Sequence, residues 1–142
     1  MIRLAPVDKA YIHQTWPLVK DYVESAFTTD CDTPREYSVY SMDNVLQYIT
    51  TGQWTLLVFL NDDDKIVGAT TVEFQVYPLH TVALVTSIGG HLIINRDTVE
   101  QYKMYCKHRG ATMIQAYGRK SIVRLWQRYK FEPRTTLVEL LL

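Results

Sequence analysis

The segment Trp54–Gly90, WTLLVFLNDDDKIVGATTVEFQVYPLHTVALVTSIGG, decides the fold. It opens with a nearly continuous apolar run at 54–60, which is typical of a strand covered on both faces. The acidic residues at 61–64 predict a solvated turn and no metal site, because no further ligands follow at calcium-loop spacing. Apolar and polar residues then alternate over 71–76, and a third strand over 82–88 ends at two glycines. The segment therefore predicts a three-stranded meander.

A strand and a helix are expected at the start of the chain. Residues 2–5 favour a short strand that Pro6 closes. Apolar residues then recur at spacings of four, three, four and three, which is one stripe of a helix: Ile12, Trp16, Val19, Val23 and Ala26. Asp8 is placed as the N-cap of this helix, and Pro17 is expected to kink or divide it.

A polar loop and a second helix are expected next. Residues 28–40 contain acidic residues and a proline and predict a loop. Ser41 is a plausible N-cap for a helix that carries Val45, Leu46 and Ile49 and ends at Gly52.

Helices and strands alternate after the meander. A helix with Val99, Tyr102 and Cys106 on one face ends near Gly110, and a strand follows at 113–117. The next helix has a stripe at i, i+3, i+4 and i+7, formed by Ile122, Leu125, Trp126 and Tyr129. Residues 135–142 predict a final strand. The whole order predicts one α/β (α+β) domain over residues 1–142, a mixed sheet of about six strands flanked by about four helices.

The composition indicates a globular chain without a strong net electrostatic field. Apolar residues make up 47% of the 142 residues, charged residues 21%, and 15 basic side chains balance 15 acidic ones. No stretch approaches the roughly 20 apolar residues that cross a bilayer, and the first residues lack the pattern of a secretory leader. Cys31 and Cys106 lie far apart without zinc spacing, so we expect two reduced cysteines and no metal site.

The element order resembles that of the GNAT superfamily of N-acetyltransferases. The closest local match is Arg119–Phe131, which resembles the pattern N-x-x-A-x-x-L-Y-E-K-x-G-F of the family's penultimate helix. Leu125 and Phe131 fall on the leucine and phenylalanine of that pattern. The resemblance implies a strand, two helices and a meander, followed by a strand–helix–strand unit that in the family grips acetyl-CoA.

A narrower likeness is to GNAT-like proteins of tailed bacteriophages, including relatives of an internal virion protein of short-tailed phages. Three features carry it in order: Gly52-Gln53-Trp54, Ile88-Gly89-Gly90 and Gly118-Arg119. This likeness implies a phage-encoded protein found in the virion or in the host cytoplasm.

The segment expected to hold the cofactor departs from the family. GNAT enzymes carry Q/R-x-x-G-x-G/A between the third meander strand and its helix, and backbone N–H groups there approach the pyrophosphate. Here residues 91–97 contain no glycine. Asp97 and Glu100 are spaced as a capping box, which would use the same N–H groups and add two negative charges. We therefore expect no cofactor.

The penultimate helix departs from the family as well. Trp126 stands where many GNAT enzymes have a tyrosine as general acid, Lys130 where they have glycine, and Arg119 where they have asparagine. The indole N–H cannot serve as an acid near neutral pH.

Single candidate residues each have a plainer explanation. Glu73 lies roughly where some GNAT enzymes keep a general base, but its alternation also fits a solvent-facing strand residue. Gly89, Gly90 and His91 could form a loop around a ligand, yet a lone histidine at such a place is more often an incidental turn residue. Arg119 could bind an anion at a helix start or pair with a neighbouring carboxylate.

Charge is unevenly distributed. The C-terminal half is locally basic, with Lys103, Lys107, His108, Arg109, Arg119, Lys120, Arg124, Arg128 and Lys130, whereas acidic residues gather at Asp21, Glu24, Asp30, Asp32 and 62–64. This asymmetry allows a face for DNA or an acidic protein, and solvated helix faces explain it equally well. Aromatic residues such as Trp54, Tyr77 and Tyr117 indicate core if buried and an interface if exposed.

The preferred hypothesis is a phage GNAT-like protein, not catalytic, that contacts a phage or host protein as a virion or virion-assembly component. A homo-oligomer is compatible with it, a membrane is not expected, and nucleic acid is not indicated. One alternative is an acetyl-CoA-dependent N-acetyltransferase with a degenerate cofactor loop, for which Glu73 is the catalytic candidate and Gly89, Gly90, His91 and Arg119 are the cofactor-binding candidates. Another is a phage inhibitor of a host protein.

Overall fold

The computed structural model describes residues 1–29 and 31–142. Asp30, part of the predicted 28–40 loop, lies outside the described residues. In chain order the elements are β1 (Arg3–Pro6), the 3-10 turn η1 (Lys9–Tyr11), α1 (Ile12–Thr28), α2 (Met42–Thr51), β2 (Thr55–Leu60), β3 (Ile66–Val76), β4 (Thr81–Gly90), α3 (Arg96–His108), β5 (Met113–Ala116) and α4 (Lys120–Gln127).

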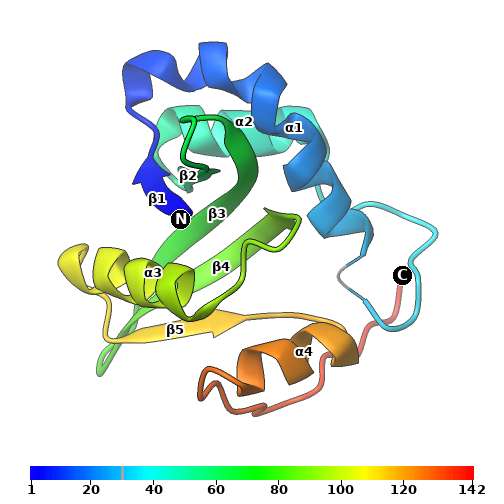
Figure 1. Cartoon of the computed structure of the whole chain (residues 1–142). Coiled ribbons are helices and arrows are strands. Elements are labelled where there is room, and N and C mark those ends of the chain that lie inside the picture. The colour runs from blue at the N-terminus through cyan, green and yellow to red at the C-terminus, as the bar shows by residue number, and fades with distance from the viewer. Residues whose placement is uncertain (30) are drawn as a thin grey trace.

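The strands form one mixed sheet in the order β1-β2-β3-β4-β5 (Figure 1). The first four strands are antiparallel neighbours, which confirms the meander, and β5 lies parallel to β4. Parallel pairing extends only from Val82 with Met113 to Val85 with Ala116, whereas β4 continues to Gly90. Thr86 is an extra residue in β4, because Thr71 pairs with Ser87 and the next residue of β3 pairs with Val85. A bulge of this kind bends a strand, and here it lies where β4 and β5 part.

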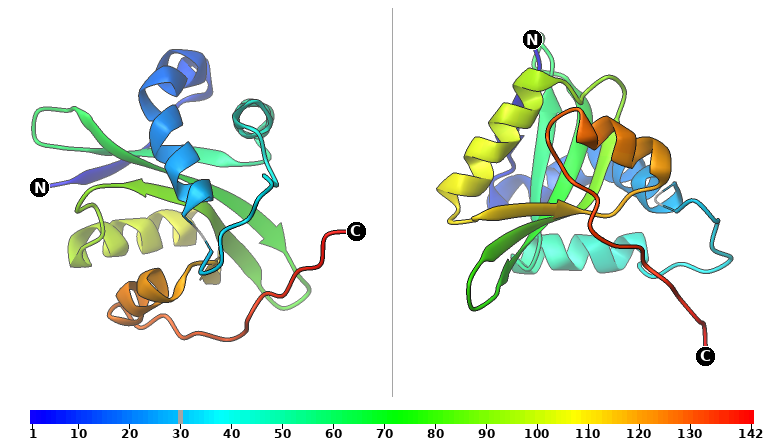
Figure 2. Two further views of the ribbon diagram at one scale, coloured as in Figure 1. Left: turned by 90° about the vertical axis from the view of Figure 1, so that its right-hand side faces the viewer. Right: turned by 90° about the horizontal axis from the view of Figure 1, so that it is seen from below.

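Helices cover both faces of the sheet. In Figure 2, α1 and α2 lie on one face and α3 and α4 on the other. Beneath α1 and α2 the buried residues are Ile12, Trp16, Val19, Val23, Val45, Ile49, Trp54, Leu56, Val58 and Ala69. Beneath α3 they are Leu57, Phe59, Val72, Ala83, Val85, Ile93, Tyr102, Cys106 and Ala111. The mixed α/β (α+β) architecture predicted for the chain is confirmed.

The caps of the first two helices follow local sequence. Asp8 accepts a hydrogen bond from the Ala10 N–H and so begins η1, after which α1 continues from Ile12. Ser41 caps α2 as predicted, and Gly52 ends it with a φ of 84°, a left-handed conformation that favours glycine.

Pro17, expected to kink or divide the first helix, does not divide it, since α1 runs through this residue. Pro17 removes one N–H, the donor to the His13 carbonyl, and both residues are exposed, so solvent can hydrate that carbonyl.

The sixth strand predicted at 135–142 is also wrong, because the segment has no strand pairing. Its side chains include exposed leucines, and its polar contact is made with the α1–α2 loop, where Glu139 accepts hydrogen bonds from Arg35 and from the Tyr37 hydroxyl (2.7 Å). A strand needs a partner backbone as well as suitable side chains, and this segment is extended without one. Within the part of the chain that is described, none of the helices has the length and apolar character required to cross a membrane.

Candidate functional site

An open recess lies where the α2–β2 turn passes over the ends of β2 and β3. Its volume is about 290 Å³, and it is lined by Tyr40, Tyr48, Gln53, Trp54, Glu73 and Phe74. Glu73 follows Ala69 by four residues in β3, so the two side chains lie on the same face of the strand. That face is covered by α1 and α2. The side chain of Glu73 is half-buried at the rim of this layer and lines the open recess.

Aromatic rings form one wall of the recess. The Tyr40 and Tyr48 ring centroids lie 5.1 and 5.0 Å from that of Trp54, and 6.0 Å from each other. Burial raises the pKa of the Tyr40 hydroxyl, and the nearby Tyr48 and Glu73 raise it further. Glu73 makes no hydrogen bond or ion pair with any residue that the structure describes. The recess is thus lined by two tyrosines, a tryptophan that is itself buried, and a carboxylate with no hydrogen bond or ion pair among the described residues.

The start of α3 is closed by side chains of the chain itself. Asn95 Oδ1 accepts from the Thr98 N–H at 3.0 Å, and Thr98 Oγ1 accepts from the Asn95 N–H at 3.0 Å. The Thr98 hydroxyl also donates to the Ile93 carbonyl at 2.5 Å and is almost completely buried. This is a capping box, and it fixes the loop between β4 and α3.

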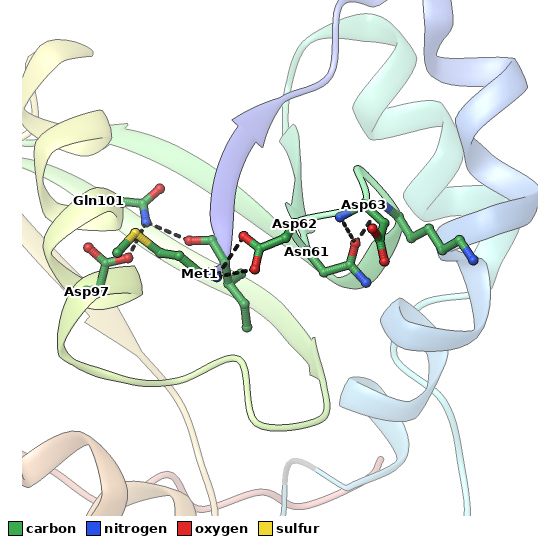
Figure 3. Close-up of polar contacts among 8 residues, drawn as sticks. Met1, Asn61, Asp62, Asp63, Asp97 and Gln101 are labelled. Carbon is green, nitrogen blue, oxygen red and sulfur yellow. Dashed lines mark hydrogen bonds and ion pairs between the residues drawn. The ribbon is translucent and has the colours of Figure 1, made fainter.

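The predicted Asp97–Glu100 box is wrong by two residues. α3 begins at Arg96, so Asp97 is already inside the first turn, where its carboxylate accepts from Gln101 Nε2 at 2.9 Å (Figure 3). The same Gln101 amide donates to the Ile2 carbonyl and accepts from the Leu4 N–H, and so ties α3 to the edge strand β1.

Glu100 is engaged in a similar way. It accepts from Lys103 Nζ at 2.9 Å, and that hydrogen bond holds the pKa of Glu100 below its usual value. Asp97, in the first turn of α3, lies at the positive end of the helix and disfavours a phosphate there, whereas Glu100 lies beyond that turn.

The two glycines that end β4 have packing roles. A Cβ on Gly89 would lie 2.2 Å from the Tyr22 carbonyl oxygen of α1, and one on Gly90 would lie 2.7 Å from the Val67 carbonyl oxygen of β3. Gly90 also has a φ of 145°. The glycines therefore let backbone segments of this chain approach each other. His91 follows them as an exposed residue of the loop, with Leu92 at a φ of 55° beside it.

An acidic side chain of the chain itself occupies the start of α4. The Lys120 N–H donates to Asp32 Oδ1 of the α1–α2 loop at 2.8 Å. Arg119, the residue before the helix, is exposed and has no ion pair with the residues described. The helix start that could bind an external anion thus holds an internal one.

The space between α3, α4 and the parted strands is filled with apolar side chains. Trp126 is 9% exposed, and its ring centroid lies 5.0 Å from that of Phe131. Phe59, Val85, Ile94 and Ile114 complete this contact. The remaining cavity measures about 10 Å³, at the lower limit for a single water molecule.

Comparison with solved structures identifies the architecture. An aminoglycoside acetyltransferase from an uncultured soil metagenomic sample, solved with sisomicin, superposes with a TM-score of 0.69 at 12% identity, over 99% of this chain and 96% of that one. A predicted acetyltransferase of Clostridium acetobutylicum, solved with acetyl-CoA, gives 0.67 at 12% identity over the same shares. A Trypanosoma brucei acetyltransferase gives 0.60 at 10% identity over the full length of both chains. The fold is that of the GNAT acetyltransferases. No protein-family model and no curated protein matches the sequence.

The residues present do not fit acetyl-CoA in this GNAT fold. The first-turn N–H of Thr98 is already bonded to Asn95, and the carboxylate of Asp97 lies in the same turn. The strand–helix unit that grips the cofactor in the family, β5 with α4, turns Trp126 and Phe131 inward and leaves no room between them and α3. Glu73, Gly89, His91 and Arg119 are not gathered into one site by any contact between the described residues.

Sequence reasoning missed the recess. Of the three aromatic residues singled out in the sequence, Trp54 is 4% exposed and belongs to the core, whereas Tyr77 and Tyr117 are exposed. Tyr40 and Tyr48 were not noticed. The concentration of aromatic residues around the α2–β2 turn was a signal in the sequence that could have indicated this recess. The recess forms only because Tyr40, the α2–β2 turn and the end of β3 meet in the folded chain.

Proposed function

We propose that this chain is a GNAT-fold protein that binds another protein and does not transfer acetyl groups from acetyl-CoA. The observation that carries this proposal is the start of α3, where Asn95 and Thr98 cap the helix that would hold a pyrophosphate. The filled space around Trp126 supports the same conclusion. The β3–β4 hairpin carries exposed apolar side chains that a partner protein could cover, since Val76 is 82% and Leu79 89% exposed.

Titration with acetyl-CoA tests the proposal. A pyrophosphate at α3 would displace the cap and face Asp97 in the first turn, whose negative charge disfavours a second anion there. Calorimetry with millimolar acetyl-CoA should therefore show no heat, and the melting temperature should not rise. The Clostridium acetobutylicum protein, titrated under the same conditions, is the positive control. A dissociation constant in the micromolar range for this chain would overturn the proposal.

The partner and setting follow from the phage likeness of the sequence. We place the protein in the virion or in virion assembly, on the support of the three features at Gly52-Gln53-Trp54, Ile88-Gly89-Gly90 and Gly118-Arg119. If a phage encodes the chain, as this proposal requires, mass spectrometry of its purified virions should detect the protein in stoichiometric amount. Its absence from virions, together with co-purification with a host protein, would instead favour an inhibitor of that host protein.

The second candidate is an N-acetyltransferase that acts on a protein or small amine. The fold and the half-buried Glu73 beside an aromatic recess favour it. In that case CoA release would be measured in the presence of acetyl-CoA and an amine, and Glu73→Gln would abolish it as the loss of a general base.

A further inference from the structure

We propose that β5 forms an interface with a second copy of this chain, in which the outer edges of the two β5 strands pair antiparallel about a two-fold axis. β5 is the last strand of the sheet and pairs with β4 along one side only (Figure 1). This inference concerns the free edge of the sheet, and it does not depend on whether the chain binds acetyl-CoA or another protein.

The opposite edge of the sheet, formed by β1, is protected against such pairing. Gln101 of α3 donates a hydrogen bond to the Ile2 carbonyl and accepts one from the Leu4 N–H, both at 2.9 Å, and so occupies backbone groups that another strand would need. Arg3 adds an exposed charge to the same strand, and Pro6, at its end, lacks an N–H. Charges and prolines are common means of blocking an edge strand.

The edge formed by β5 has none of these protections. Residues 111–118, ATMIQAYG, contain no charged residue and no proline. Apart from the pairing with β4, the backbone of residues 113–117 makes no hydrogen bond with any residue that the structure describes. The edge therefore keeps backbone donors and acceptors that another strand can satisfy. Because it carries no charge, two copies of it can approach without placing like charges opposite each other.

A two-fold axis normal to the sheet determines which residues pair. Such an axis makes the two strands antiparallel and places one residue directly opposite its own copy. Ile114 packs in the apolar contact around Trp126, whereas Met113 and Gln115 point to the other face of the strand and are exposed. With Gln115 on the axis, Met113 of each copy lies opposite Tyr117 of the other. These two side chains are 37% and 64% exposed, and a thioether packs favourably against an aromatic ring.

The interface is small, so we expect the dimer to form reversibly. Pairing over about six residues buries less than the roughly 1,600 Å² of a standard protein interface, and we expect a dissociation constant on the order of 100 µM. Sedimentation velocity of the whole chain between about 10 and 500 µM should show the mean mass rising from that of the monomer toward that of the dimer. A mass that stays monomeric throughout this range would rule out the pairing.

Charges placed at Gln115 test the symmetry of the interface. Gln115→Lys and Gln115→Glu each put like charges opposite each other and should each weaken the dimer by a factor of about five. An equimolar mixture of the two variants pairs opposite charges instead and should recover dimerisation to at least the level of the parent, which also shows that both variants fold. Gln14→Lys, the same change on the exposed surface of α1, should leave dimerisation unchanged. Dimerisation that neither charge weakens, or that the mixture does not recover, would mean that the copies meet elsewhere, and the proposal would be wrong.

Discussion

Lys130 stands in a conformation that glycine adopts most easily. Its φ is 70°, three residues after the end of α4, and its N–H donates to the Gln127 carbonyl while the Phe131 N–H donates to the Trp126 carbonyl. This is the hydrogen-bond pattern of a helix stopped by a left-handed residue. The pattern that this segment resembles has glycine at this position, and here a lysine adopts the conformation that favours glycine.

Replacing Lys130 by glycine should therefore stabilise the protein. Relief of the left-handed strain exceeds the extra entropy of the unfolded glycine, and we expect a gain of about 0.5–1 kcal/mol in the free energy of unfolding. Urea denaturation measures it. Lys107→Gly, in the last turn of α3 with ordinary helical backbone, is the control and should lose up to about 1 kcal/mol. A loss of stability in Lys130→Gly would contradict the prediction that left-handed strain at Lys130 outweighs the entropy of glycine.

The ends of a helix could be predicted from sequence where the residues that fix them lie within one turn of each other. Ser41 and Gly52 bound α2 as expected, because a cap and a left-handed stop act within one turn. The start of α3 was misplaced, since both Asn95 with Thr98 and Asp97 with Glu100 fit a capping box. Burial of Thr98 decides between them, and burial depends on the packing of α3 against the sheet, which no local pattern contains.

Trp126 anchors α4 to the rest of the molecule. It is the buried residue of that helix, and with Phe131 it fills the space beside α3. Trp126→Ala should cost about 3–5 kcal/mol in unfolding free energy. Thermal and urea unfolding measure the loss, and Tyr117→Ala, at a residue that is 64% exposed just before the helix, is the matched control with little expected change. Equal stability of the Trp126 variant and the parent would mean that α4 does not pack in this orientation.

At the scale of the molecule, the sheet was predictable and the meeting of distant segments was not. Alternation over 71–76 placed Glu73 on the correct face of its strand, but it could not show that α2 covers that face or that Tyr40 and Tyr48 come beside it. The strand predicted at 135–142 was wrong for the same reason. Its side chains suit a strand, and only the complete fold shows that the segment runs to the α1–α2 loop instead.

That contact between the tail and the loop gives a prediction about pH. Hydrogen bonds from Arg35 and Tyr37 lower the pKa of Glu139 to about 2, from an ordinary value of 4.5. A carboxyl whose pKa is lowered in the folded state stabilises its contact above its ordinary pKa, and the contact is lost as pH falls through the lowered one. We therefore expect the tail to stay docked at pH 4 and to detach as the pH approaches about 2. Nuclear magnetic resonance of the Glu139 amide should show one transition with a midpoint near 2. Glu139→Gln should remove the transition, while Glu132→Gln, which breaks only the exposed pair with Arg134, should leave it in place. A midpoint near 4.5 in the parent protein would mean that Glu139 is not held by the loop, and the tail would then be free to pair elsewhere.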